Sequence, residues 1–330
     1  MKMSSSHGEF VFLILGIMKL VHGDNCFDVD SVVEHEKYME HQLFRKFWSP
    51  SLYDCASECL MSSACASFGF DKKMHTCLLN TNSSEAGNVV DRTGFLFSDI
   101  QQWPKSLSGR CNQVACPENT RCEVTRLGQS TCVPEFQGCG QPPGVKGATI
   151  TYDGHYQGAV ATYSCEQDFR VCHNNVTSTC QSSGAWETPS GLCGQYRWHN
   201  PVKDRYSFPC GPSNKFRLII RGTLTAETSW DLGLKKHEDV LFYSDFRFNL
   251  GKRIIMNTKL DGSLGQEVHA DLTMEVGQES QVQITLQDGV YRLVIDGVSI
   301  HNFTERRSGA KPNSIFFYGD VSVSVMEWIS

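Results

Sequence analysis

The sequence has 330 residues, 15 of them cysteines, and a formal net charge of −6. The charge is small and no basic cluster stands out, which argues against nucleic acid as a partner. All 15 cysteines lie between Cys26 and Cys210. This density is typical of disulfides formed in an oxidising compartment, whereas the spacings do not match a metal site such as zinc. We therefore predict small stapled modules followed by a cysteine-free domain long enough to hold its own core.

The first 23 residues have the pattern of a secretory signal peptide. Lys2 supplies a positive start, Phe10–Met18 is an uncharged apolar run, and small residues precede a cleavage site after Gly23. The run is too short for a membrane span, and no later apolar stretch approaches the roughly 20 residues that a bilayer requires. The alternative interpretation is an N-terminal core strand. On the first interpretation the protein is secreted, extracellular and without a membrane span.

N-glycosylation sequons also fit export, because this modification occurs on the surface of secreted proteins. The sequons begin at Asn82, Asn175 and Asn302. Asn302 falls in the cysteine-free part of the chain. A glycan there would make the nearby surface a poor protein interface.

A short helix followed by strands is predicted in the first module. Ser49 and Pro50 predict the helix start, as the cap and the first-turn residue. Helical character then continues from Leu52 to Met61. Short strands are predicted at residues 66–71 and 77–80.

This module, residues 24–108, resembles the PAN/apple domain family in the segments 51–59, 65–68 and 77–80. The resemblance implies two disulfides, Cys55–Cys77 and Cys59–Cys65, that clamp the helix onto the strands. Members of the family bind proteins or sugars. We therefore expect a docking module.

Residues 109–137 contain the spacing Cys111-x4-Cys116-x5-Cys122-x9-Cys132, which resembles the first half of an EGF-like module. The resemblance implies the pairs Cys111–Cys122 and Cys116–Cys132. The closing Cys-x-Cys of that family is absent, and so are the acidic calcium-binding residues before Cys111. We therefore expect no calcium and no other cofactor. The alternative interpretation is a stapled linker.

Residues 138–195 contain four further cysteines and Trp186, in a pattern that resembles a sushi (complement control) domain. The resemblance implies the pairs Cys139–Cys180 and Cys165–Cys193, with Trp186 packed in the small core between them. Cys172 departs from this pattern. It reaches Cys210 or Cys26, or it lies free. Because 15 is odd, at least one cysteine lacks an intrachain partner, which leaves an intermolecular disulfide open.

Residues 196–330 are predicted to form a linker and a domain of many strands. Alternating apolar segments occur at 216–224 and 240–248, and Asp288-Gly289 and Asp296-Gly297 predict tight hairpin turns. Many short-spaced strands without helices predict a β-sandwich. The fold class is therefore mostly β and multidomain, with disulfide-rich modules before the sandwich.

From about residue 205 onward the chain resembles the galectin family, a jelly-roll β-sandwich. The segments that carry the resemblance are Leu218–Gly222, Arg247-Phe248, Asn257–Leu260, Val294–Gly297 and Gly319–Val321. In galectins, one strand presents His, Asn and Arg at alternate positions on one face, and the next strand adds an Asn. A Trp-Gly-x-Glu segment follows, with an Arg two residues after the Glu. The matching positions here are Tyr243, Asp245, Arg247, Asn257, Leu264, Glu267 and His269.

The substitutions at these positions predict weak binding of ordinary β-galactosides. Replacing the Trp by Leu264 removes aromatic stacking worth about 0.5–1.5 kcal/mol. Loss of the His and Asn donors removes hydrogen bonds worth about 0.5–1.5 kcal/mol each. Together these losses would weaken a micromolar site to beyond millimolar. Arg247, Asn257 and Glu267 remain, either as an inherited Arg–Glu ion pair or as a retuned glycan site in which Tyr243 supplies a stacking surface.

No catalytic motif is present, and the histidines, including His237 and His269, are scattered. We therefore predict a binding protein and not an enzyme. The leading hypothesis is a secreted lectin-like adhesion or extracellular-matrix protein that binds glycans, glycoproteins or other matrix and cell-surface proteins. The alternatives are a matrix protein that binds proteins but no sugar, and a secreted immune or toxin-type effector.

Overall fold

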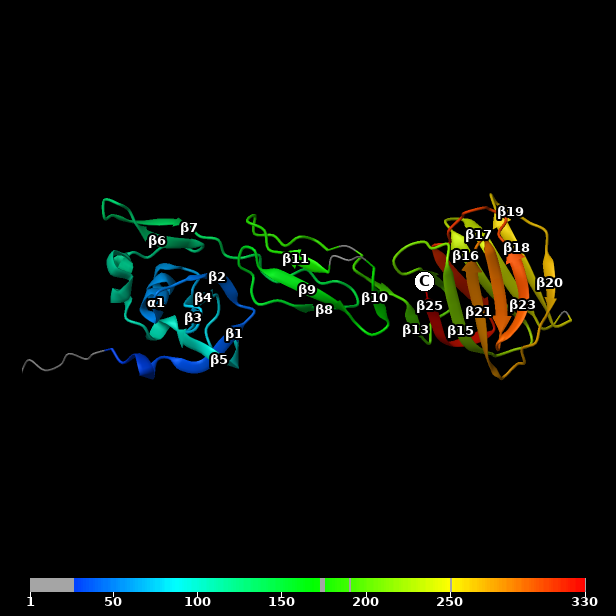
Figure 1. Ribbon diagram of the computed structural model, residues 1–330, viewed down its shortest axis with the longest axis horizontal. Helices are drawn as coiled ribbons and strands as arrows, with labels where there is room; N and C mark the ends of the chain where they lie inside the picture. The colour runs from blue at the N-terminus through cyan, green and yellow to red at the C-terminus, as the bar shows by residue number, and fades with distance from the viewer. Residues whose placement is uncertain (1–26, 173–175, 190, 250, 330) are drawn as a thin grey trace, which may run out of the picture. The chain divides into compact units, whose positions relative to one another are not determined.

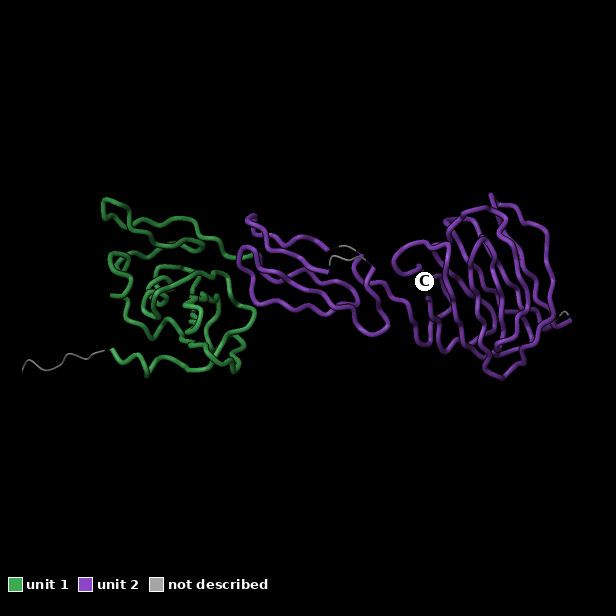
Figure 2. The backbone as a smooth tube through the Cα atoms, in the orientation of Figure 1, with its two compact units in different colours: residues 1–138 green, residues 139–330 purple. Residues whose placement is uncertain are grey.

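The computed structural model describes residues 27–172, 176–189, 191–249 and 251–329. The predicted signal peptide, Cys26 and Asn175 lie outside these ranges. The chain separates into two compact units, residues 1–138 and 139–330, which Figure 2 draws in different colours. Each unit is described by itself.

In the first unit, one α-helix packs against a five-stranded antiparallel sheet with the order β1-β5-β3-β4-β2 (Figure 1). In chain order the elements are β1 (Glu34–Glu40), β2 (Leu43–Trp48), α1 (Leu52–Met61), β3 (Ser67–Asp71), β4 (Thr76–Asn80) and β5 (Asn88–Asp99). Three 3-10 helices accompany them: η1 (Val29–Ser31), η2 (Ile100–Gln102) and η3 (Lys105–Gln113). Phe68 and Leu79 are fully buried between the helix and the sheet.

The predicted cap of helix α1 is wrong by two residues, because Ser51 caps the helix and Ser49 does not. The hydroxyl of Ser51 accepts a hydrogen bond from the backbone N of Asp54 at 3.2 Å and donates one to the Asp54 carboxylate at 2.5 Å. The Ser51 side chain thus satisfies one backbone donor of the first turn, the N of Asp54. Ser49 is buried instead, and its backbone N donates to the carbonyl of His75.

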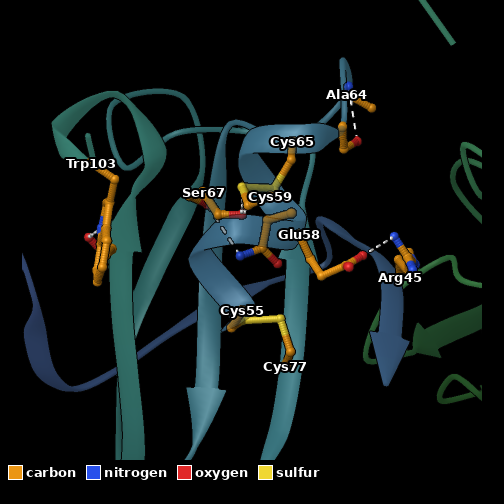
Figure 3. Close-up of a disulfide and its surroundings, with 12 residues drawn as sticks. Arg45, Cys55, Glu58, Cys59, Ala64, Cys65, Ser67, Cys77 and Trp103 are labelled. Carbon is orange, nitrogen blue, oxygen red and sulfur yellow. Dashed lines mark hydrogen bonds and ion pairs between the residues drawn. A yellow bond between two sulfur atoms is a disulfide. The ribbon is translucent and has the colours of Figure 1, made fainter. Parts of the chain in front are cut away.

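Two disulfides fasten α1 to the sheet (Figure 3). Cys55 joins Cys77 on β4, and Cys59 joins Cys65, which directly precedes β3. These are the pairs that the PAN resemblance implied. Beside them, Trp103 is buried, and its indole N donates to the Ser98 hydroxyl at 2.7 Å. A core this small relies on such cross-links.

The predicted EGF-like segment forms a β-hairpin of β6 (Thr120–Val124) and β7 (Ser130–Pro134). The disulfides Cys111–Cys122 and Cys116–Cys132 are present. The segment therefore has its own short sheet and two cross-links of its own. Its assignment as EGF-like remains a prediction.

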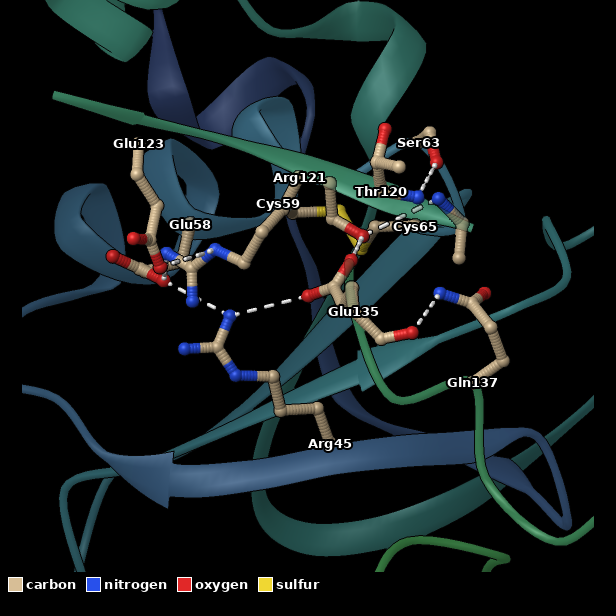
Figure 4. Close-up of polar contacts among 12 residues, drawn as sticks. Arg45, Glu58, Cys59, Ser63, Cys65, Thr120, Arg121, Glu123, Glu135 and Gln137 are labelled. Carbon is tan, nitrogen blue, oxygen red and sulfur yellow. Dashed lines mark hydrogen bonds and ion pairs between the residues drawn. A yellow bond between two sulfur atoms is a disulfide. The ribbon is translucent and has the colours of Figure 1, made fainter. Parts of the chain in front are cut away.

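Charged side chains connect this hairpin to the helical module within the first unit (Figure 4). The Glu58 carboxylate on α1 lies 3.1 Å from Arg45 and 2.9 Å from Arg121. The Glu135 side chain is only 4% exposed, lies 3.4 Å from Arg45 and accepts a hydrogen bond from the Ser62 hydroxyl. A buried carboxylate is tolerated when such partners compensate its charge. The hairpin and helix α1 are thus held together by paired charges.

The second unit begins with short strands and two cross-links that match the sushi resemblance. Its strands are β8 (Ala148–Thr151), β9 (Val160–Cys165), β10 (Phe169–Val171), β11 (Thr177–Thr179) and β12 (Cys193–Gln195). The disulfides Cys139–Cys180 and Cys165–Cys193 are present. Trp186 is buried and pairs with Cys180 in an isolated bridge, and its indole N donates to the carbonyl of Gly140 at 2.9 Å.

A seventh disulfide joins Cys172 to Cys210. Of the three alternatives for Cys172, the structure therefore contains the bond to Cys210. The bond ties the sushi region to the segment that leads into the C-terminal sandwich. Hydrogen bonds from the Tyr196 and Arg197 backbone N atoms to the carbonyl of Asp168 reinforce this connection.

The C-terminal domain is the predicted β-sandwich of two antiparallel sheets (Figure 1). One sheet contains β13 (Arg197–His199), β15 (Phe216–Leu224), β21 (Glu279–Gln287), β22 (Val290–Ile295), β23 (Val298–Thr304) and β25 (Val321–Ile329). The other contains β14 (Arg205–Ser207), β16 (Ser229–Lys236), β17 (Asp239–Arg247), β18 (Arg253–Leu260), β19 (Ser263–Leu264), β20 (Val268–Asp271) and β24 (Ser314–Gly319). Both predicted tight turns join neighbouring strands, and Gly289 and Gly297 have the positive φ that such turns require.

The core of the sandwich lies between the two sheets, and several strands show the alternating burial that this arrangement requires. In β15, for example, Leu218 and Ile220 point inward while Arg217 and Arg221 are exposed. Trp230, Phe246 and other aromatic residues fill the interior. The outward-facing positions are consequently free to carry a binding site.

Candidate functional site

A pocket of about 300 Å³ lies on the outer face of the sheet that contains β17 and β18. Five of the seven predicted site residues line it: Tyr243, Arg247, Asn257, Leu264 and Glu267. Asp245 and His269 are not among its lining residues. The volume is at the lower end of the range for small-molecule sites in proteins.

Strand alternation and register bring these residues together. On β17, Tyr243, Asp245 and Arg247 occupy alternate positions and therefore share one face. Tyr243 pairs with Asn257 on β18. On its other side it pairs with Gly233 on β16. The positions inferred from the galectin pattern thus converge through ordinary sheet geometry.

Arg247 pairs with Asp245 and not with Glu267. The guanidinium Nε of Arg247 donates to the Asp245 carboxylate at 2.5 Å, and the Asp245 side chain is 8% exposed. This hydrogen bond raises the pKa of Arg247. The interpretation of an inherited Arg247–Glu267 ion pair is therefore wrong, because a carboxylate at position 245 lies nearer to the guanidinium on the same strand.

Glu267 instead pairs with His269, 3.3 Å away, and both side chains are about half exposed. His269 thus supports the pocket from outside it. Leu264 is 71% exposed at the pocket edge. As a branched aliphatic side chain it offers contact area but no π-face.

Tyr243 is held by a carboxylate of the neighbouring strand that the sequence pattern did not reveal. Its hydroxyl donates to Asp231 on β16 at 2.7 Å. Burial raises the pKa of Asp231 and is also the main reason that the pKa of Tyr243 is raised. Asp231 lies directly opposite Asp245 in the sheet, so two carboxylates share the base of this face. One accepts from Tyr243 and the other from Arg247.

Arg306 is a second residue that sequence analysis missed. It follows β23, a strand of the other sheet, and its Nη1 donates to the Asn257 side-chain oxygen at 2.9 Å. The Asn257 oxygen also accepts from the backbone N of Thr258 at 2.8 Å. With that oxygen occupied, the amide NH2 of Asn257 is the group left to donate to a ligand. A second nitrogen of Arg306 donates to the carbonyl of Gln266.

Gly265 makes room for this arginine. A Cβ atom at position 265 would lie 2.1 Å from Nη1 of Arg306. The glycine of the family's Trp-Gly-x-Glu segment therefore has a local reason to be present here. Through Arg306, the wall that carries Leu264 and Glu267 is fastened to Asn257.

The remaining lining residues include Phe316 on β24 and Lys259 on β18. Phe316 belongs to a strand about 70 residues away in sequence from Tyr243 but adjacent to β16 in the sheet. No pattern within either segment indicated that they would meet. Only the sheet order places Phe316 at the pocket.

Two of the three predicted glycosylation sites lie in the described residues. Asn302 is exposed on β23, at the edge of its sheet. The side-chain NH2 of Asn82 donates to the carbonyl of Ala86 at 3.2 Å. Within the same part of the chain, no group of three or more His, Cys, Asp or Glu residues could hold a metal ion.

Comparison with known families finds three matches in the predicted order. A PAN domain model matches residues 32–101, a sushi repeat model matches 139–193, and a galactoside-binding lectin model matches 204–328. The chain carries a PAN domain, a sushi repeat and a galactoside-binding lectin domain. No helix among the described residues is long and apolar enough to cross a membrane.

Solved structures similar to this chain include galectins. Galectin LEC-6 of Caenorhabditis elegans is 18% identical, with a TM-score of 0.39, over 41% of this chain and 96% of that one. Sheep galectin-11 in complex with glycerol is 19% identical, with a TM-score of 0.35, over 39% of this chain and 98% of that one.

A curated mouse protein is also similar: sushi, von Willebrand factor type A, EGF and pentraxin domain-containing protein 1. It is 30% identical over 77 residues, which are 23% of this chain and 2% of that protein. The match thus spans a very small part of the relative. The three domain families together support a lectin-like or adhesion protein, and they are generally non-enzymatic.

Proposed function

We propose that this protein is a secreted lectin-like adhesion or extracellular-matrix protein whose sandwich binds a glycan other than an ordinary β-galactoside. The observation that carries the proposal is the gathering of Arg247, Asn257 and Glu267 in one pocket. Together they offer donors and an acceptor at a site whose walls are partly apolar. Such a combination suits a sugar, which presents hydroxyls at its edges and C–H groups on its faces.

Weak binding of β-galactosides is part of this proposal. Leu264 replaces the stacking ring, and Asp245 occupies Nε of Arg247. Both changes remove interactions that the usual galectin residues at these positions would make with galactose. Calorimetry with lactose tests this point, since a micromolar dissociation constant would contradict it.

A glycan array probed with the secreted full-length protein tests the function itself. We expect binding to a restricted set of extracellular glycans, and loss of that binding in Arg247→Ala. A matched control is Arg253→Ala, because Arg253 lies opposite Arg247 on β18 but does not line the pocket. Equal loss of binding in both variants would point to a general charge effect.

The main alternative is a matrix protein that binds proteins but no sugar, and the substitutions at 243, 245 and 264 favour it. In that case the PAN domain and the sushi repeat would dock other matrix or cell-surface proteins, and the array would show no bound glycan. A secreted immune or toxin-type effector would use the same modules. Export itself is tested by N-terminal sequencing of protein recovered from culture medium, which we expect to begin after Gly23.

A further inference from the structure

The ring of Phe316 lies over a glycine in the sheet that carries the pocket. The glycine is Gly233 on β16, which lies between Phe316 on β24 and Tyr243 on β17. A Cβ atom at position 233 would lie 2.3 Å from two atoms of the Phe316 ring. The tip of the ring therefore occupies the space that a side chain at 233 would fill. Glycine at this position is what allows Phe316 to reach across the strand.

Phe316 is part of a larger aromatic surface. Its ring is 6.5 Å from that of Tyr243 with an interplanar angle of 29°, and 5.7 Å from that of Tyr318 at 32°. The ring planes of Tyr243 and Tyr318 are thus each inclined by roughly 30° to the plane of the Phe316 ring. Of these, Phe316 and Tyr243 line the pocket. An aromatic floor of this kind offers an apolar face to a ligand.

Polar groups face the same pocket from other strands. Asn257 presents its amide NH2 because its oxygen is held by Arg306 and Thr258. Arg247 retains its Nη groups as donors because Asp245 engages Nε. One ligand in this volume would meet the aromatic floor and these donors together.

The charges nearest the floor offer little attraction to an anion, which favours an uncharged ligand over an anionic one. The charge of Arg247 is compensated by Asp245. Glu267, with His269 3.3 Å away, adds no attraction for an anion. Lys259, on the far side of the pocket beside Leu264, is the remaining charged residue of the lining. An anionic group would be attracted to Lys259 and not to the aromatic floor.

We infer that Phe316, lying over Gly233, is the stacking ring of this site, and that the ligand is a neutral pyranoside whose C–H face rests on that ring. The hydroxyls of the sugar then reach Arg247 and Asn257. This inference rests on the proposed glycan binding and adds the class of sugar and the residue that orients it. The stacking position thus lies on strand β24 and not at Leu264 on β19.

Two variants remove the stacking ring in different ways. Phe316→Leu keeps apolar volume but removes the π-face, and Gly233→Ala places a Cβ where the ring now lies. The control is Tyr318→Leu, which changes an exposed ring on the same strand outside the pocket. Leu264→Ala is a comparison, because it shortens a pocket-lining side chain on β19 without changing the ring. Thermal unfolding of each full-length protein verifies that the sandwich is folded.

The probe is a panel of neutral disaccharides: lactose, N-acetyllactosamine, chitobiose and cellobiose. Saturation-transfer NMR with irradiation of the aromatic protons reports contact between rings and sugar C–H groups. For the disaccharide that binds best, we expect Phe316→Leu and Gly233→Ala each to reduce affinity about two- to tenfold. Tyr318→Leu should change it less than twofold, and the loss in Leu264→Ala should be smaller than in either ring variant.

The outcomes separate this inference from the function it rests on. If wild-type protein binds no saccharide on either the panel or the array, both proposals fall. If the wild type binds a saccharide and both Phe316→Leu and Gly233→Ala bind it as tightly as the wild type does, the glycan function stands and the stacking role of Phe316 is refuted. If only sulfated or carboxylated glycans bind, and Lys259→Ala alone abolishes that binding, the neutral class is refuted.

Discussion

The PAN region and the C-terminal sandwich maintain their folds by different means. The principal core of the PAN region has 11 buried residues, four of which are cysteines in disulfides. The sandwich core has 30 buried residues and no cysteine. In the first case the residues that define the family also hold the fold. In the second, the fold depends on inward positions and the ligand site on outward ones.

This difference explains why the lectin match predicts a fold more securely than a ligand. Tyr243, Asp245 and Leu264 stand at outward or edge positions, so replacing the usual residues there leaves the core unchanged. A cysteine of the PAN pattern cannot be exchanged in this way, because removing a native disulfide from a small domain costs about 2–5 kcal/mol. The sandwich is therefore the part of the chain in which specificity can diverge.

Reducing the disulfides should produce the largest difference in stability between the two regions. Under a reductant in native buffer, we expect the PAN and sushi regions to unfold and the sandwich to remain folded, because only the former depend on disulfides within their cores. Limited proteolysis with mass spectrometry would then yield a protected fragment that starts just before β13, near Tyr196. Digestion of both regions at the same rate would contradict this comparison.

A core substitution should have the converse effect. Phe246 is fully buried and stacks on Trp230 with ring centroids 4.7 Å apart. Phe246→Ala should lower the free energy of unfolding of the sandwich by about 3–5 kcal/mol. Calorimetric unfolding should show a lower transition temperature for the sandwich and an unchanged one for the stapled modules. Tyr318→Ala, on the outer face, serves as control.

Loss of Arg306 should loosen the pocket wall more than the domain as a whole. Arg306→Gln removes charged hydrogen bonds to Asn257 and Gln266, each worth about 1.5–3 kcal/mol. Hydrogen exchange of the 264–267 backbone amides should become faster. Arg307→Gln is the matched control, because Arg307 pairs with Asp239 and Asp261 outside the pocket lining. Faster exchange of that segment in both variants would argue against a specific role for Arg306.

Restoring an aromatic ring at the loop should strengthen lactose binding. Leu264→Trp places a π-face at an exposed pocket edge, where it should increase affinity about two- to tenfold. NMR titration with lactose measures the change, and Leu264→Met controls for added apolar volume. An unchanged affinity would show that the substitutions at positions 243 and 245 are sufficient to explain the weak binding of lactose.

The smallest effect concerns pH. Burial raises the pKa of Asp231 above its ordinary value of 3.8, so the folded state favours the protonated carboxyl. Its contribution to stability is therefore present below about pH 4 and is lost as the pH rises through the folded pKa. Asp231→Asn should consequently raise the unfolding temperature slightly at neutral pH and less at pH 4. A lower unfolding temperature at neutral pH would contradict this sign.

Local sequence signals predicted what local chemistry determines. The range of helix α1, the hairpin turn at Asp288-Gly289 and the alternation of β17 all depend on residues close together in the chain. The prediction of the helix cap was wrong by two residues, because Ser49 and Ser51 both match the preference for serine at a helix N-cap. Only the hydrogen bond to the Asp54 backbone distinguishes them.

The site residues that sequence analysis missed come from distant segments. Strand order places Phe316 in the pocket lining and Asp231 against Tyr243. Arg306 comes from the other sheet and contacts Asn257. Galectin positions identified one side of the pocket, since they lie on β17, β18 and the loop after them. The side formed by β16 and β24 has no corresponding signal in a single sequence.

The bond between Cys172 and Cys210 also has a mechanical consequence. The two cysteines are 38 residues apart, so tension applied along the chain would cross the sulfur–sulfur bond before it could stretch the intervening segment. Because Cys165–Cys193 already bypasses the first part of this segment, the bond restrains at most the stretch from Cys193 to Cys210, or roughly 60 Å at about 3.6 Å per extended residue. If the sandwich were attached to a surface, the disulfide would keep its connection to the sushi repeat short. A pulling force on the chain would then reach the attached sandwich after little extension.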